Sequence, residues 1–103
     1  MNFEIKYLAN DFDINDDNCD VNIYLENKRV FFGTLFTPMN IHTLIARFRK
    51  SGECLNGKYF WSANMLIVEN LERSTVDQVI NELIENGGFF EIFTEIPNPL
   101  TLQ

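Results

Sequence analysis

The sequence is poor in the residues from which metal and disulfide sites are built. Its 103 residues include one histidine and two cysteines, which excludes zinc-finger spacings and a framework of several disulfide bridges. It has no phosphate-binding loop and no nucleophile-elbow motif. His42 has no neighbouring partner set that would make it catalytic. The sequence therefore predicts no enzyme activity and no bound cofactor.

Targeting signals are lacking as well. The chain does not open on a basic segment followed by an apolar run of signal-peptide length. No stretch approaches the roughly 20 apolar residues that a membrane span requires. We therefore expect a cytoplasmic protein that inserts in no membrane, with Cys19 and Cys54 as free thiols in a reducing compartment.

Basic residues are scarce compared with acidic ones. Eight Lys and Arg face 15 Asp and Glu, so the formal net charge is −7. A polyanion binder favours a basic surface, and nucleic acid is therefore not an expected partner. The chain is 46% hydrophobic and includes ten Phe, which excludes low-hydrophobicity disorder. These residues can fill the core of a single domain over residues 1–103.

Strand patterns dominate the first third of the chain. Apolar and charged residues alternate in Phe3–Tyr7, and a second alternation covers Val21–Leu25. Val30–Phe36 follows after a short polar turn, which predicts an antiparallel hairpin. The loop composition of residues 11–20 separates the first strand from this hairpin.

Two helices are predicted from capping residues and apolar spacing. Thr37-Pro38 is a helix start, and Gly52 a stop. Ser74 begins the second helix in a variant of the capping box with Asp77, and Gly87 ends it. The two apolar stripes are Ile41, Leu44, Ile45 and Phe48, and Val76, Val79, Ile80 and Leu83.

Further strands complete the predicted fold. Asn56-Gly57 predicts a small hairpin within Glu53–Trp61. Met65–Val68 is typical of an interior strand covered on both faces, and Phe89–Phe93 of a last edge strand. Residues 96–103 form a Pro-containing tail. The order is strand–strand–strand–helix–(strand–strand)–strand–helix–strand. It predicts an α+β fold with a mainly antiparallel sheet of about five or six strands and two helices on one face.

The acidic run Asp11–Asp20 raises the question of calcium. Asp11, Asp13 and Asn15 match the first, third and fifth positions of an EF-hand loop. Asp16 stands where the loop needs glycine, and Asn22 where it needs a bidentate glutamate. Because half of the pattern is missing, a loop of Asx turns is favoured over a calcium site. An acidic contact surface for a basic partner is the other alternative.

The aromatic run Tyr59-Phe60-Trp61 divides between two faces if it is a strand, because alternate side chains point in opposite directions. We expect core on both faces. The alternative is that Tyr59 and Trp61 form an exposed patch that binds protein. The same two interpretations apply to Phe89 and Phe90.

Charge is segregated along the chain. The net charge is −5 over residues 1–20, +1 over 21–40, +3 over 41–60 and −6 over 61–103. The acids of the second helix form either a solvated face or, if the fold brings them near the acidic run, part of one acidic surface. These helix acids are Glu72, Asp77, Glu82 and Glu85.

These features predict a small acidic protein-binding domain that masks a basic partner, such as a toxin. The profile is similar to that of bacterial immunity proteins as a class, and no motif identifies a particular family. The expected contact residues are Asp11, Asp13, Asp16, Asp17, Glu72, Asp77, Glu82, Glu85, Tyr59 and Trp61. One alternative is a structural or adaptor domain that self-associates as a homodimer through its aromatics. The other is a small-molecule module that uses Tyr24 or Asn64.

Overall fold

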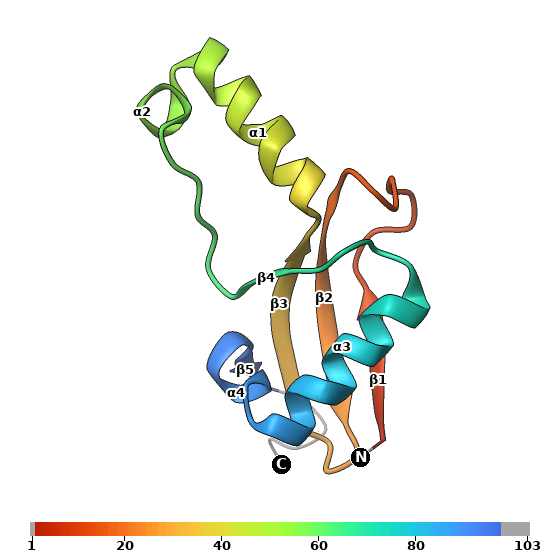
Figure 1. The fold of residues 1–103 in the computed structure, drawn as a ribbon. Helices are drawn as coiled ribbons and strands as arrows, with labels where there is room; N and C mark the ends of the chain where they lie inside the picture. The colour runs from red at the N-terminus through yellow and green to blue at the C-terminus, as the bar shows by residue number, and fades with distance from the viewer. Residues whose placement is uncertain (1, 98–103) are drawn as a thin grey trace.

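The computed structural model describes residues 2–97 as an α+β fold (Figure 1). The elements follow the order β1(Phe3–Tyr7), β2(Asn18–Leu25), β3(Val30–Phe36), α1(Pro38–Ser51), α2(Glu53–Gly57), β4(Met65–Ile67), α3(Arg73–Asn86), α4(Phe89–Ile92) and β5(Thr94–Ile96). The first three strands and the two long helices are those that the sequence predicts, although β2 starts three residues earlier than expected.

The sheet is mainly antiparallel, as predicted. β1 pairs with β2 and β2 with β3, both antiparallel. The other side of β3 is shared: β4 runs parallel to its end at Thr34–Phe36, and β5 runs antiparallel to its start at Val30–Phe32. The chain leaves β3 through α1 and comes back as far as Thr34 before it runs beside β3 again in the same direction, and a long connection of this kind can join parallel strands.

The core lies between one face of the sheet and the helices α3 and α4, which cover it (Figure 1). Strand alternation places Val21, Ile23 and Leu25 of β2 on this face. Val76 and Ile80 of α3 pack against them and are fully buried. The core is therefore closed by the second half of the chain, and no residue of α1 belongs to this cluster.

α1 begins and ends as its sequence predicts. The Thr37 Oγ1 accepts a hydrogen bond from the backbone amide of Asn40 at 3.2 Å, and Pro38 occupies the first helical position. Gly52 adopts a left-handed conformation and donates to the carbonyl of Phe48 at 2.9 Å. However, α1 projects from the end of the sheet (Figure 1). The prediction that both long helices lie on one face is wrong for α1. We call residues 38–64 the arm.

The predicted hairpin within Glu53–Trp61 is wrong. Cys54, Leu55 and Asn56 all have left-handed backbone angles, with φ between 51° and 60°, and form the turn α2. Gly57 then lies so close to α1 that an added Cβ would be 2.6 Å from the carbonyl oxygen of Ile45. Asn-Gly favours positive φ in a hairpin turn and here as well. The contact of Gly57 with α1 selects a turn packed on this helix instead of a hairpin.

Two later strand predictions also need correction. β4 is an edge strand rather than an interior one, and Ile67 on it is 52% exposed. The segment Phe89–Phe93 is not a strand, because α4 occupies its first four residues and places the ring of Phe89 in the core. The last strand is β5, in which Ile96 pairs with Val30. The predicted tail therefore starts too early, and residues 98–103 of it lie outside the described residues.

The start of α3 differs from its prediction. Glu72 is the N-cap residue, without a side-chain cap bond, and Ser74 lies inside the first turn. The predicted capping box of Ser74 and Asp77 is therefore wrong. The end is as predicted, since Gly87 adopts the left-handed conformation that stops the helix. Among residues 2–97, none of the helices has the length and apolar character to cross a membrane.

Candidate functional site

The acidic loop between β1 and β2 is held together by its own carboxylates. Asp13 Oδ1 accepts hydrogen bonds from the backbone amides of Asn15 and Asp16, at 2.9 and 3.2 Å. Asp17 Oδ2 accepts from the amide of Asp13 at 3.0 Å, and its Oδ1 from the amide of Asn18 at 2.9 Å. These are the Asx-type bonds that let Asp and Asn replace regular backbone pairing in a loop.

Asp16 joins this loop to the first turns of the arm. Its carboxylate accepts from Asn40 Nδ2 at 3.3 Å and from the Thr43 hydroxyl at 3.1 Å. Asn18 Nδ2 donates to Asn40 Oδ1 at 2.9 Å. The backbone amide of Asp17 donates to the Thr37 hydroxyl at 3.3 Å. Asp16 and Asp17 are half-buried and therefore position the base of α1, whereas Asp11 and Asp13 remain exposed.

The same hydrogen bonds help to distinguish a loop of Asx turns from an EF-hand calcium site. The carboxylate oxygens of Asp13, Asp16 and Asp17 are turned toward backbone and side-chain donors of the protein. Within residues 2–97 no group of three or more His, Cys, Asp or Glu side chains is arranged to hold a metal ion. The loop is thus of the Asx-turn type that the sequence favours over an EF-hand.

The acidic loop lies against the start of α3. The backbone amide of Leu71 donates to the carbonyl of Ile14 at 2.8 Å, and the side chain of Leu71 is buried. This bond brings the loop beside Glu72, so the two acidic segments meet in the fold. The sequence alone does not determine whether these two segments are neighbours.

Tyr7 fills the space between these segments. Its ring stacks on Phe12 at 6.0 Å, and the Arg73 guanidinium lies 4.3 Å from its centroid. Burial raises the pKa of Tyr7 to about 12, with Arg73 lowering it and Asp77 raising it. Among the described residues the Tyr7 hydroxyl has no hydrogen-bond partner. The buried ring thus contacts both the acidic loop, through Phe12, and the first turn of α3, through Arg73.

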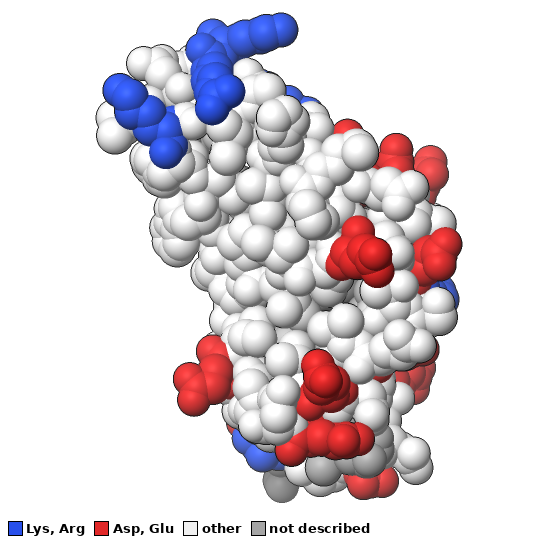
Figure 2. All heavy atoms as spheres, viewed as in Figure 1, with Lys and Arg blue, Asp and Glu red and all other residues white. Residues whose placement is uncertain are grey.

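The four helix acids predicted as contacts are all exposed along α3. Glu72 stands at its N-terminal end and Asp77 one turn into it, near the acidic loop. Glu82 and Glu85 follow toward the other end, and Glu85 accepts a bond from Asn81 Nδ2 at 2.9 Å. The helix thus carries acids from the loop to α4. We call the described residues outside the arm the body. Figure 2 shows acidic side chains distributed over the body.

The aromatic run belongs to the arm and is not a strand. Phe60 packs between the rings of Phe36 and Phe48, with centroids 5.2 and 6.2 Å apart. Tyr59 and Trp61 point outward and are 47% and 71% exposed. The expectation of core on both faces is wrong here; Tyr59 and Trp61 are exposed, as in the alternative, and their binding of protein stays a prediction. The pair Phe89 and Phe90 divides similarly, with Phe89 buried and Phe90 46% exposed.

Charge follows this division between body and arm. The arm holds Arg47, Arg49, Lys50 and Lys58 but a single acid, Glu53, so its net charge is +3. The rest of the chain therefore has a net charge of −10. Figure 2 shows Lys and Arg gathered at the tip of the arm, away from the acids. The net charge over residues 41–60 indicates this basic patch, but the expected contact residues include none of its bases. They do not include Leu55 either, which is 68% exposed on the same arm.

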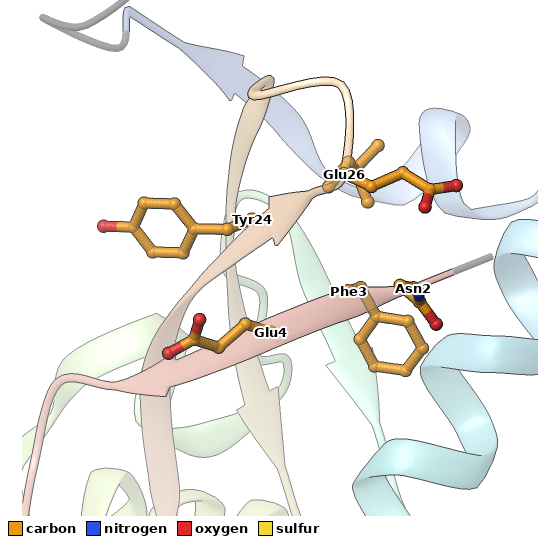
Figure 3. A pocket seen from close by; sticks show the side chains of 6 residues that line it. Asn2, Phe3, Glu4, Tyr24 and Glu26 are labelled. Atoms are coloured by element: carbon orange, nitrogen blue, oxygen red, sulfur yellow. The ribbon is translucent and has the colours of Figure 1, made fainter.

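A shallow hollow of about 280 Å³ lies at the start of β1 and the end of β2, lined by Asn2, Phe3, Glu4, Tyr24, Leu25 and Glu26 (Figure 3). Strand alternation sends Glu4 and Tyr24 to one face and Phe3 to the other. The polar side chains of Glu4 and Tyr24 and the apolar ring of Phe3 therefore do not enclose one small ligand between them. Asn64, the other predicted ligand residue, donates to the carbonyl of Ile92 at 3.0 Å and accepts at its own carbonyl from Thr34.

Comparisons of the chain with protein-family models, with curated proteins and with solved structures find no match.

Proposed function

We propose that this protein is a small protein-binding domain of the inhibitor type, which masks a basic partner in the manner of a bacterial immunity protein and a toxin. The observation that carries the proposal is the bond from Leu71 to Ile14, which joins the acidic loop to the acidic helix. Exposed acids from both segments then occupy neighbouring parts of the surface: Asp11, Asp13, Glu72 and Asp77.

Such a surface suits recognition of a basic protein. Its four acids outnumber the one base among them, Arg73, and clustered negative charge steers a basic partner and raises its association rate by ten-fold or more at low salt. The contacts need no chemistry from the domain itself. Loop carboxylates that are already bound to backbone amides keep the loop ordered, so little conformational entropy is lost on binding. We propose the cytoplasm as the compartment in which partner and inhibitor meet.

The test is affinity capture from a lysate of the source cells at low and high salt, followed by kinetics with the recovered partner. The test variant carries Glu72→Lys and Asp77→Lys. A matched control carries Glu4→Lys and Glu26→Lys, which change the net charge equally on β1 and in the β2–β3 turn. Circular dichroism verifies that both variants are folded.

The expected result is a basic protein that the wild type and the control capture at low salt and release at high salt. The test variant should associate with it at least ten-fold more slowly. Equal association rates for the test variant and the control would overturn the proposal. Recovery of no basic protein by the wild type would overturn it as well.

A further inference from the structure

The tip of the arm has the composition of a contact surface. Leu55 and Trp61 are 68% and 71% exposed, and Tyr59 is about half exposed. Trp and Tyr are the side chains that most often anchor protein interfaces. The charged residues of the arm are four bases and one acid, Glu53. We define the arm patch by Leu55, Tyr59, Trp61, Arg47, Arg49, Lys50 and Lys58.

The opposite end of the molecule carries a patch of complementary character. Phe90 of α4 is 46% exposed, next to the exposed Glu91. Arg29 approaches its ring at 5.8 Å, but this guanidinium forms a two-bond pair with Glu95, at 3.0 and 2.9 Å. We define the far-end patch by Phe90, Glu82, Glu85 and Glu91. It holds one exposed aromatic ring and three exposed acids from α4 and the last turns of α3, and the charge of Arg29 beside the ring is balanced by Glu95.

The two patches lie at opposite ends of one edge of the sheet. Along β3, the arm begins after Phe36, β4 follows beside Thr34–Phe36, and β5 lies beside Val30–Phe32. α2 and α4 both lie on the left of the molecule in Figure 1. The half-exposed Ile67 of β4 is on the same edge, between them. The molecule is elongated, with principal extents of 47 × 29 × 27 Å.

We propose that two copies of this chain associate antiparallel about a two-fold axis, with the arm patch of each copy on the far-end patch of the other. Two-fold symmetry is the commonest arrangement of homo-oligomers, and it uses every contact twice. Each copy has a net charge of −7. Screening limits charge interactions to about 8 Å in physiological salt, so the opposite charges in contact outweigh that net repulsion.

This inference needs no second protein and is independent of the proposed function. The far-end patch uses Glu82, Glu85 and Glu91, whereas the proposed surface for a basic partner lies around the acidic loop and Glu72. Failure of one proposal therefore leaves the other standing.

The first test is sedimentation velocity of the full chain over a range of concentrations. The wild type should pass from monomer to dimer as its concentration rises. Trp61→Ala should weaken the dimer by at least ten-fold, because truncation of a central aromatic anchor has costs of this order. Leu8→Ala is the matched control, since Leu8 is also about half exposed but lies outside both patches, and it should dimerise like the wild type. A wild type that stays monomeric throughout would overturn the proposal.

The second test exchanges charge between the patches. One variant carries Arg47→Glu, Lys50→Glu and Lys58→Glu, which makes the arm patch acidic, and the other carries Glu82→Lys and Glu91→Lys, which makes the far-end patch basic. Each should be monomeric alone, because its two patches then have the same sign. An equimolar mixture should form a one-to-one heterodimer, since both contacts again join opposite charges.

Two outcomes would overturn this arrangement. Dimers that persist in each variant alone would show that the contact lies elsewhere. A mixture that stays monomeric would show that the two patches do not pair. Binding of RNA or anionic vesicles by the wild-type protein would then assign the arm patch to a polyanion.

Discussion

The backbone amide of Leu71 donates a 2.8 Å hydrogen bond to the carbonyl of Ile14, across 57 positions of sequence. It joins the acidic loop between β1 and β2, which has few backbone hydrogen bonds of the strand or helix type, to the segment that leads into α3. Both bonded groups lie in irregular backbone, where a buried amide without a partner would be costly. This one contact turns two separate acidic segments into neighbours and supports the proposed binding surface.

The conformation of Gly57 predicts a large difference between two glycine substitutions. Gly57 and Gly87 both have positive φ, 74° and 86°, but only at Gly57 would a new Cβ contact other atoms, 2.6 Å from Ile45 O and Arg49 Cγ. Left-handed geometry alone costs about 1–2 kcal/mol for a residue with a Cβ. Gly57→Ala should therefore destabilise the protein more than Gly87→Ala. Urea unfolding measures both, and equal losses would contradict the close packing at Gly57.

The bonds of Asp16 predict that it stabilises the fold although it belongs to an acidic surface. Asp16→Ala leaves Asn40 Nδ2 and the Thr43 hydroxyl without this acceptor. The expected loss in the free energy of unfolding is about 1–3 kcal/mol. Asp11→Ala is the control, because Asp11 is exposed in the same loop, and should change stability by less than about 0.5 kcal/mol. Similar losses for the two variants would show that the bonds of Asp16 to Asn40 and Thr43 do not stabilise the fold.

Phe60 is predicted to fasten the returning chain of the arm to α1. Its ring contacts Phe36 and Phe48, so Phe60→Ala should cost about 2–4 kcal/mol, toward the low end because the residue is half-buried. The protein has a single Trp, Trp61, which reports on this segment by fluorescence. Limited proteolysis should cut the variant between residues 57 and 65 faster than the wild type. Tyr59→Ala, at an exposed ring, serves as the comparison and should resist cleavage like the wild type.

Tyr7 predicts a loss of stability at alkaline pH. Its folded pKa is raised to about 12 from an unfolded value of about 10, so the folded state holds the phenol proton more tightly. This tighter binding of the proton adds to the free energy of unfolding. The added stability is complete below pH 10 and is lost as the pH rises from 10 to 12, in total about 2–3 kcal/mol. Tyr7→Phe should remove this part of the pH dependence in unfolding curves measured between pH 8 and 12.

The same variant has a second readout at neutral pH. Because the Tyr7 hydroxyl has no hydrogen-bond partner among the described residues, its removal should leave stability unchanged or slightly increased. A marked loss at pH 7 would show that the hydroxyl has a stabilising contact. An unchanged alkaline slope would show that another group is responsible for it.

Local features of the fold were predictable because neighbouring residues determine them. Period-two alternation placed β1, and an apolar run after a polar turn placed β3. Thr37, Pro38 and Gly52 set the limits of α1 through cap bonds and a left-handed stop. Gly87 ended α3 for the same reason. Net charge by segment also indicated an acidic body and a basic stretch, because composition does not depend on the fold.

Tertiary contacts decided the rest. Asn56-Gly57 favours positive φ in any turn, and only the closeness of Ile45 and Arg49 selected α2 over a hairpin. The run Phe89–Phe93 can form a strand or a helix, and burial of Phe89 against the sheet selected the helix. The pairing of β4 with β3, the exposure of Trp61 and the bond from Leu71 to Ile14 join positions far apart in sequence. Such contacts depend on how the whole chain packs its apolar surface, which no local pattern contains.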